Sequence, residues 1–458
     1  MKMVKSLLLG TAAGLVAMTG AQAADLPVKA KPVQYVKICS LYGAGFYYIP
    51  GTDTCLKVGG FVRAEINFNA GGSFNPYRSQ NFDTPARDFQ TMRTRAGFTL
   101  DARSQTEYGT LRSYAIIAAM QTNGGAVGGT PYSTPFSNFA FIQFAGFTAG
   151  STASFFEFDG QGYSNFTPYI TSAQAGGGIG VFGYTAQLGN GLSASIAAED
   201  PTVRRSAIAN AVAGNTATYG GRRWPDVVAN LRIDQAWGSA QIMGAIHDVY
   251  GVNTLATNTT ANATGYAFGG GLKINLPMLG KGDNIVMQGT YAKGATNYLF
   301  SQSGAGGIGA FALTTGFVAA TNTALGPVFD AVFTGAAGTT AMELSTGYHF
   351  TGGFEHYWVS NLRTSLYGGY GRLRYSDAAS AALAVVAGAG TAGSANFSAY
   401  QIGSRTVWTP VTNLDLSVDV VYSKVQTAFA GSTTATYGTF QDKGFWAGMF
   451  RAQRNFYP

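Results

Sequence analysis

The stretch that decides the fold is residues 89–103, which read FQTMRTRAGFTLDAR. From Thr91 to Arg103, polar side chains fall mainly on odd positions and apolar side chains mainly on even positions, with Thr94 as the exception. The polar set is Thr91, Arg93, Arg95, Thr99, Asp101 and Arg103, and the apolar set is Met92, Ala96, Phe98, Leu100 and Ala102. This alternation predicts a β-strand with one polar face and one apolar face.

The same period of two recurs from Leu56 to the end of the chain, and it predicts an all-β protein of sixteen antiparallel strands. The predicted strands are Leu56–Phe68, Phe89–Arg103, Thr106–Met120, Asn138–Gly146, Phe147–Phe156, Gly178–Leu188, Gly191–Glu199, Asp226–Ala236, Gly238–Asp248, Ala263–Asn275, Asn284–Lys293, Thr340–Glu355, Leu362–Tyr375, Asn396–Trp408, Thr412–Lys424 and Lys443–Arg454.

The connections between these strands alternate between long and short. The long ones are 69–88, 121–137, 157–177, 200–225, 249–262, 294–339, 376–395 and 425–442, and the short ones include 104–105, 189–190, 276–283, 356–361 and 409–411. Short turns at one end and long loops at the other are typical of a transmembrane β-barrel in the bacterial outer membrane. A soluble β-sandwich has no reason to alternate in this way.

The composition agrees with a barrel in a membrane. Of 458 residues, 46% are hydrophobic, 11% are charged and 63 are glycine. Disordered and nucleic-acid-binding chains need far more charge, so we expect no nucleic-acid partner. The longest apolar stretch lies at the N-terminus and is too short for a transmembrane helix. A multi-pass barrel in contact with outer-membrane lipid explains both observations.

The cost of placing charge in lipid determines which face of each strand points inward. An arginine on the lipid face costs roughly 2–4 kcal/mol at the bilayer midplane, so strand arginines must face the lumen. The sheet must also close, because backbone polar groups find no water in hydrocarbon. A barrel of sixteen strands leaves an aqueous channel. The charged residues that we expect on its wall are Arg63, Glu65, Arg93, Arg95, Asp101, Arg103, Arg112, Arg232 and Arg405.

The N-terminus predicts export. Residues 1–23 combine Lys2 and Lys5, an apolar middle and an Ala-Gln-Ala end, as a secretory signal peptide does. Its removal lowers the formal charge from +7 to +5. Cys39 and Cys55 are the two cysteines of the chain, and in an oxidising compartment they most simply form one disulfide. We expect three parts: the signal peptide (1–23), a periplasmic segment (24–55) and the barrel (56–458).

The third long loop, residues 157–177, is the best candidate for narrowing the channel. It opens with Phe-Glu-Phe-Asp-Gly, which sets Glu157 and Asp159 among aromatic residues. Folded inward, these carboxylates would face the wall arginines and create a transverse field that sets ion preference. The alternative is a solvated acidic pair, or a calcium contact in a loop that faces lipopolysaccharide.

No catalytic, cofactor or metal site is expected. His247, His349 and His356 lack the spacing of metal ligands, and no serine motif supports a hydrolase. Three functional classes remain open: a passive channel for ions and small solutes, a substrate-selective facilitator, and a surface adhesin anchored by a barrel. Few aromatic residues fall on the polar strand faces, which counts against the facilitator.

Several segments resemble the general porins of alphaproteobacteria, and the resemblance covers the mature chain, residues 24–458, from end to end. The segments are 36–63 (VKICSLYGAGFYYIPGTDTCLKVGGFVR), 94–97, 101–103, 107–112 and 448–456. The resemblance implies a homotrimer and passive diffusion of small hydrophilic solutes through a constriction. It also implies that Glu157 and Asp159 are the loop acids and that Arg63, Arg93, Arg95 and Arg112 form the facing wall. The ending Phe456-Tyr457-Pro458 and the long apolar loop 294–339 depart from the family pattern.

Overall fold

The computed structural model describes residues 37–70, 89–123, 132–158, 162–172, 178–210, 217–253, 259–300, 322–334, 341–387, 393–434 and 438–456. The chain divides into two units, Met1–Ile38 and Cys39–Pro458. The second unit is a β-barrel.

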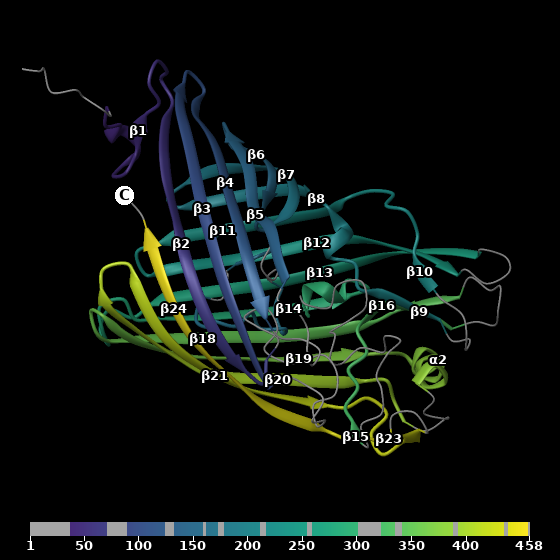
Figure 1. Ribbon diagram of the computed structural model, residues 1–458. Helices are drawn as coiled ribbons and strands as arrows, with labels where there is room; N and C mark the ends of the chain where they lie inside the picture. The colour runs from purple at the N-terminus through teal and green to yellow at the C-terminus, as the bar shows by residue number, and fades with distance from the viewer. Residues whose placement is uncertain are drawn as a thin grey trace, which may run out of the picture. The chain divides into compact units, whose positions relative to one another are not determined.

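Sixteen long strands form a closed antiparallel barrel, as the sequence predicts. The strands are β2 (Cys55–Phe68), β3 (Gln90–Thr106), β4 (Gly109–Asn123), β5 (Tyr132–Phe144), β6 (Phe147–Thr152), β7 (Ile179–Gly189), β8 (Leu192–Glu199), β11 (Asp226–Gln235), β12 (Gly238–Asn253), β13 (Thr259–Asn275), β14 (Asn284–Lys293), β18 (Thr346–Val359), β19 (Leu362–Arg374), β20 (Phe397–Val411), β21 (Leu414–Gln426) and β24 (Lys443–Phe456). Each strand pairs with the next, and β24 pairs with β2, from Gly60↔Phe456 to Phe68↔Gly448, which closes the sheet (Figure 1).

Side chains alternate between the two faces of the barrel wall. On β3, Met92 and Phe98 are 46% and 55% exposed, whereas Arg93 and Arg95 are buried. Because inward and outward positions alternate along every strand, large apolar side chains are exposed around the outside of the barrel. Among them are Val62, Ile117, Phe182, Ile242, Phe268, Phe350, Leu366, Ile402 and Phe450. An outward apolar face and an inward polar face are what a barrel needs in lipid.

Several strands extend further than the sequence pattern predicts. β12 continues to Asn253 and β13 begins at Thr259, so most of the predicted loop 249–262 is paired strand. β5 likewise begins at Tyr132, and the first short turn lies at 107–108 rather than at 104–105. The apolar–polar alternation reports only the part of a strand that faces lipid. Beyond it, pairing continues without the alternating pattern.

Short turns lie at one end of the barrel and long loops at the other. At Asn190-Gly191 both residues have positive φ, 50° and 75°, as a two-residue type I′ hairpin requires. The long loops carry short elements: η2 (Pro201–Val203), β9 (Ala207–Asn210), β10 (Ala217–Tyr219), η3 (Thr296–Tyr298), β15 (Asn322–Thr323), β16 (Phe329–Phe333), β17 (Met342–Leu344), α2 (Asp377–Ala387), β22 (Thr433–Thr434) and β23 (Gly438–Phe440). Several of them gather at the right-hand end of the barrel in Figure 1.

Helix α2 lies in the predicted loop 376–395, where the strand pattern predicts no helix. Its residues are mostly alanine, the strongest helix former, and Ser376 Oγ accepts a hydrogen bond from the Ala379 N–H at 3.1 Å as an N-cap. Within the described part of the chain, no helix is long and apolar enough to cross a membrane.

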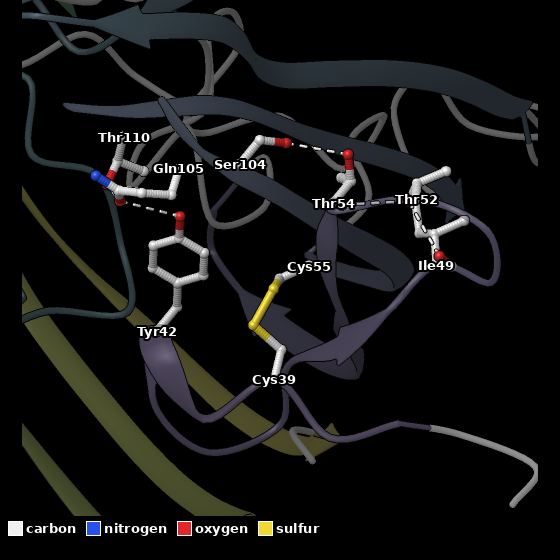
Figure 2. Close-up of a disulfide and its surroundings, with 9 residues drawn as sticks. All are labelled: Cys39, Tyr42, Ile49, Thr52, Thr54, Cys55, Ser104, Gln105 and Thr110. Carbon is white, nitrogen blue, oxygen red and sulfur yellow. Dashed lines mark hydrogen bonds between the residues drawn. A yellow bond between two sulfur atoms is a disulfide. The ribbon is translucent and has the colours of Figure 1, made fainter. Parts of the chain in front are cut away.

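The N-terminal segment is tied to the short-turn end of the barrel. Cys39 and Cys55 form the predicted disulfide, and they enclose η1 (Ser40–Tyr42) and β1 (Tyr47–Tyr48) (Figure 2). β1 pairs with the start of β2, and the Thr54 and Ser104 hydroxyls lie 3.0 Å apart. The disulfide therefore joins this segment directly to the first barrel strand.

Candidate functional site

Arginines converge on the inward face of β2, β3 and β24 around one carboxylate, Glu65. Arg93 Nη1 lies 3.7 Å from Glu65 Oε1, and Arg451 Nη2 lies 3.1 Å from Glu65 Oε2. In the strand register Glu65 is opposite both of these arginines, and Arg63 is directly opposite Arg95. We call these five residues the Glu65 cluster. Counting only described residues, it sets four guanidinium groups against one carboxylate.

Two like charges directly opposite each other destabilise a strand pair. Arg63 and Arg95 hold such positions, so the barrel tolerates a local cost there. A neutral acceptor offsets part of the cost, because Arg63 Nε donates to Gln453 Oε1 at 2.7 Å. The neighbouring Arg93 Nε likewise donates to a neutral acceptor, Thr122 Oγ1, at 3.0 Å. An arrangement that costs stability and concentrates positive charge on a wall is a candidate for a function.

The third long loop contacts side chains on many strands. Strand β6 ends at Thr152 and not at the predicted Phe156, so this loop begins at residue 153. Near its start, Glu199 accepts hydrogen bonds from Ser154 Oγ and the Phe155 N–H, both at 2.7 Å. Further on, Asn230 and Arg232 of β11 donate to the carbonyls of Phe155 and Phe158, at 2.6 and 3.2 Å. The Phe158 ring fills the space over Gly271, where an added Cβ would come within 2.3 Å of it.

Residues 162–172 continue this pattern on other strands. Tyr163 donates to Asn284 of β14, and its ring lies against Gly353 of β18. Ser164 Oγ donates to Asp419 of β21 at 2.9 Å, and the Tyr169 N–H donates to Gln401 of β20 at 3.2 Å. Partners on β11, β14, β18, β20 and β21 all belong to the inward set of their strands.

Asn165 connects this loop to the Glu65 cluster. Arg451 Nη2 donates to the Asn165 carbonyl at 2.7 Å, and Nη1 donates to its side-chain oxygen at 3.1 Å. The Asn165 N–H donates to Asp419, and its side-chain nitrogen donates to Ser417 at 2.9 Å. One side chain and its backbone thus bind β21 and β24 together, at the edge of the arginine-rich wall.

Arg103 and Arg112 belong to a separate ion-pair group near the short-turn end. Both form paired hydrogen bonds to Asp101, at 2.7–3.0 Å. Arg103 also lies over the Phe46 ring, with its Cζ 5.0 Å from the ring centroid. The structure therefore separates Arg112 from the Glu65 cluster with which the resemblance grouped it.

Arg232 and Arg405 occupy two further wall positions. Arg232 pairs with Asp234 at 2.9 Å, and its Cζ lies 5.2 Å from the centroid of the Phe158 ring. Arg405 pairs with Glu355 at 3.0 Å. Both therefore have an acidic partner on the wall.

The two loop acids lie at the start of the third long loop. The Glu157 N–H donates to the Ser154 carbonyl at 3.0 Å, and the Glu157 carbonyl accepts from Gln241 of β12 at 3.3 Å. Asp159 lies outside the described residues. The pairing of these acids with Arg63, Arg93 and Arg95 stays a prediction.

A second buried polar group joins two long loops to the barrel wall. Asp330 of β16 accepts hydrogen bonds from the Ser206 N–H, the Thr296 N–H and the Tyr219 hydroxyl, at 2.6–2.7 Å. His247 Nδ1 of β12 lies 2.7 Å from Asp226 of β11. Further links are the Thr296 hydroxyl to Asp330, the Tyr298 hydroxyl to Asp226, and the Tyr219 hydroxyl 3.2 Å from His247 Nε2.

We call this group the Asp330 network. Asp226, His247 and Asp330 are all 0% exposed, and burial raises the pKa of Asp330, although His247 and the hydroxyl donors oppose that shift. Each carboxylate has several donors. The network therefore acts as a structural connection between the loops and the barrel wall.

Sequence reasoning missed Arg451, Glu355 and most of the Asp330 network. Arg451 could have been found, because it alternates with Phe450 in the predicted strand 443–454. Asp330 and Asn165 lie in loops and carried no pattern. Among the described residues no group of three or more His, Cys, Asp or Glu side chains could hold a metal ion.

Comparison with known proteins gives matches along most of the chain. Residues 25–449 match the family described as the Porin subfamily. Porin Omp2b of Brucella abortus (strain 2308) is 35% identical over 250 residues, which cover 52% of this chain and 64% of that protein. Porin Omp2b of Brucella suis biovar 1 (strain 1330) is 36% identical over 253 residues, with the same shares. The chain thus spans less than two thirds of the length of these relatives.

A solved structure is similar in fold. The outer membrane channel DcaP of Acinetobacter baumannii superposes with a TM-score of 0.60, covering 89% of this chain and 99% of that chain. The two are 16% identical, so the likeness concerns the fold alone.

Proposed function

The chain belongs to the porin subfamily, and from that premise we propose that it forms a water-filled passage for ions and small hydrophilic solutes. It is a multi-pass protein of the bacterial outer membrane. The observation that carries the proposal is the closed sheet of sixteen strands with charged side chains on its inward face and exposed apolar side chains on its outward face. Such a barrel is too wide for its own side chains to fill. No catalytic role is part of the proposal.

We propose further that the third long loop lies inside the barrel and narrows the passage. The hydrogen bonds from residues 154–172 to inward side chains of β11, β14, β20, β21 and β24 support this. A loop held by so many strands leaves the remaining passage beside β2 and β3. That passage is the one that the Glu65 cluster would line.

The selectivity mechanism follows from the charges. Arg63, Arg93 and Arg95 supply positive charge from the wall, and Glu157 with Asp159 would supply negative charge from the loop. Opposed charges across a narrow passage orient and sort ions by their sign, as rings of charged side chains do in other pores. Because an enclosed, poorly polarisable wall focuses the field, the effect is stronger than in open water.

The test is conductance of the purified protein in planar lipid bilayers. We expect discrete conductance steps; their absence would overturn the channel proposal. In a salt gradient, Glu157→Gln with Asp159→Asn should shift the reversal potential towards anion preference. Asp53→Asn with Glu107→Gln is the matched control, because it removes two exposed acids from the short-turn end. Equal reversal potentials for both double variants would remove the loop acids from the constriction.

The remaining expectations concern processing and assembly. We propose that residues 1–23 are a signal peptide, and the family match, which begins at residue 25, is compatible with cleavage after Ala23. We also propose a homotrimer in contact with lipopolysaccharide, as the resemblance implies. The mass of the mature N-terminal peptide and chemical crosslinking in outer membranes test these two points.

A further inference from the structure

Four glycines lie on the outward face of four adjacent strands, and the Phe350 ring lies beside one of them, Gly289. Gly270 of β13 is opposite Gly289 of β14, and Gly352 of β18 is opposite Gly368 of β19. Met287 lies opposite Gly352, so the two glycine pairs occupy neighbouring rows of the sheet. Successive residues of a strand point to opposite faces of the sheet. Gly271, Gly353 and Gly369 contact residues 158–170 of the third loop, so Gly270, Gly352 and Gly368 beside them point outward. Gly289 points outward with Met287, which is two positions before it and 45% exposed.

A shallow, open hollow of about 830 Å³ lies over these glycines and extends across the neighbouring strands β8, β11 and β12. We call it the outer hollow. Its outward rim is apolar and includes Ile242, Leu272, Met287, Phe350 and Tyr370, and it continues onto β8 and β11 with Leu192, Leu231 and Ile233. An added Cβ at Gly270 would meet only the Gln241 carbonyl oxygen, at 3.6 Å, so a side chain would fit there. The absence of side chains is therefore not imposed by crowding at this position.

Basic residues stand above the outer hollow, towards the long-loop end. Lys293 of β14 and Arg374 of β19 share one row across β18, and Arg372 belongs to the row below. All three continue the outward set of their strands. Lys293 is four positions beyond Gly289, which is ~13 Å along a strand. Within the described part of the chain the structure gives none of these three residues an acidic partner.

Tyrosines lie between the basic residues and the outer hollow. Tyr348 packs against Tyr370 and Phe350, with ring centroids 6.2 and 5.8 Å apart. Tyr291 packs against Phe268 at 5.4 Å. Aromatic rings at this level mark the membrane–water interface of a barrel. The basic residues therefore lie at the depth of lipid headgroups, and the outer hollow lies at the depth of acyl chains.

From this arrangement we propose that the outward face of β13, β14, β18 and β19 binds one molecule of lipid A, the membrane anchor of lipopolysaccharide. Its phosphates would contact Lys293, Arg372 and Arg374, and an acyl chain would occupy the outer hollow. Guanidinium groups bind phosphate through paired, charge-assisted hydrogen bonds. The inference rests on the outer-membrane location in the proposed function, but it does not depend on conduction.

Charge favours this occupant over a second copy of the chain. Any contact of this face with a second copy would bury Lys293, Arg372 and Arg374, for which the described part of the chain supplies no acidic partner. A two-fold contact would in addition bring these basic residues of the two copies against each other. A molecule that carries two phosphates above several acyl chains matches the basic residues with its phosphates and the apolar outer hollow with its acyl chains. The long-loop end of a barrel faces the outer leaflet, where lipopolysaccharide resides.

The experiment titrates diphosphoryl lipid A into the folded full-length protein in detergent, with bound lipid measured by native mass spectrometry. Gly270→Leu fills the outer hollow, and Arg372→Gln with Arg374→Gln removes the charge. We expect each change to weaken lipid A binding about tenfold, which is 1.4 kcal/mol. The charge variant keeps the test valid if the leucine variant does not fold.

Two controls use the same strands or their neighbours. Gly244→Leu fills another outward glycine position, where an added Cβ would meet only the Ala267 carbonyl oxygen at 3.8 Å. Lys281→Gln removes a charge from the turn at the opposite end of the β13–β14 hairpin. Both should bind lipid A like the unmodified protein. If all variants bind lipid A equally well, the proposal is overturned. It is also overturned if the protein binds phosphatidylglycerol as tightly as lipid A and the variants weaken both to the same extent.

Bilayer conductance keeps the two proposals apart. All of these variants should conduct like the unmodified protein, because no inward side chain is changed. Loss of lipid A binding with normal conductance supports the lipid site. Normal lipid A binding in a protein that does not conduct would support the lipid site and overturn the channel.

Discussion

The Glu65 cluster and the Asp330 network are both groups of buried charged side chains, but their charges balance differently. Around Glu65, four arginines surround one carboxylate, and two of them face each other across a strand pair. Around Asp330 and Asp226, by contrast, backbone N–H groups, hydroxyls and a histidine supply the donors. Within the part of the chain that the structure describes, the first group holds more arginines than acids, and the acids of the second accept hydrogen bonds from several donors.

The difference assigns separate roles to the two groups. A cluster with excess charge projects a field into the space beside it, which suits the sorting of ions. A buried network with satisfied acceptors holds its side chains and loops in one arrangement. Removal of one member leaves its partners buried without a hydrogen bond, which destabilises the folded state. We therefore expect the Glu65 cluster to govern selectivity and the Asp330 network to govern loop position.

The largest effect is expected from Asp330→Ala. It leaves the Ser206 and Thr296 N–H groups and the Tyr219 hydroxyl buried without their acceptor, at roughly 1–3 kcal/mol each. The loops 200–225 and 294–345 should detach from the wall and become accessible to protease, while the barrel strands stay resistant. Mass spectrometry of the fragments locates the cleavage sites.

Asp200→Ala is the control for this prediction. Asp200 lies in one of the same loops, but its side chain is 44% exposed and its partner Arg222 is 59% exposed. Such an exposed pair contributes little to stability. If Asp330→Ala resists protease as well as Asp200→Ala does, the network does not hold the loops.

A smaller effect is expected from Arg93→Gln with Arg95→Gln. The change removes half of the arginines in the Glu65 cluster and should raise the ratio of cation to anion permeability by roughly 2–5-fold. The reversal potential in a salt gradient measures it. Lys281→Gln with Lys424→Gln removes two charges from a turn and the outer face, so it should leave the ratio unchanged. If Asp330→Ala changes the permeability ratio and the arginine double variant does not, the roles of the two groups are reversed.

The strands of the Glu65 cluster were predictable from the sequence, and the partners of its arginines were partly so. Period-two alternation places Arg63, Glu65, Arg93 and Arg95 on the inward face because lipid excludes charge from the other face. The register that puts Glu65 opposite Arg451 depends on closure between β2 and β24, which lie at opposite ends of the chain. Local patterns carry no information about that pairing.

The Asp330 network was not predictable because loop residues supply most of it. Asp330 and Thr296 come from a loop without periodicity, and their contacts with Tyr219 and Ser206 arise only when two loops pack together. The sequence pattern likewise ended the lipid-facing part of β12 at Asp248, although pairing continues to Asn253. Lipid excludes charged side chains, so the inward and outward residues of the barrel wall can be predicted from the sequence. At the long-loop end, which is in water, charged residues can point in any direction.

The smallest effect is expected at the short-turn end, where Asp283 closes the turn between β13 and β14. Asp283 Oδ1 accepts the Tyr357 N–H at 2.8 Å, and Oδ2 lies 2.6 Å from His356 Nδ1. Burial alone would raise the pKa of Asp283, but the hydrogen bonds from Tyr357 and His356 lower it below its usual value. The carboxylate therefore stabilises the fold above the pKa of the unfolded chain, about 3.9, and this contribution is lost as the pH falls through the lower, folded pKa.

Asp283→Asn should accordingly lower the thermal midpoint at pH 7 by roughly 1–2 °C, and the difference from the unmodified protein should shrink as the pH falls below about 4. Heat-dependent loss of β-structure, followed by circular dichroism at several pH values, measures it. Asp53→Asn, an exposed acid at the same end, should give no pH-dependent difference. Because the turn lies far from both buried groups along the strands, reversal potential and protease resistance should not change. A shift in either one would mean that the short-turn end is coupled to the Glu65 cluster or to the Asp330 network, and that the two are not independent.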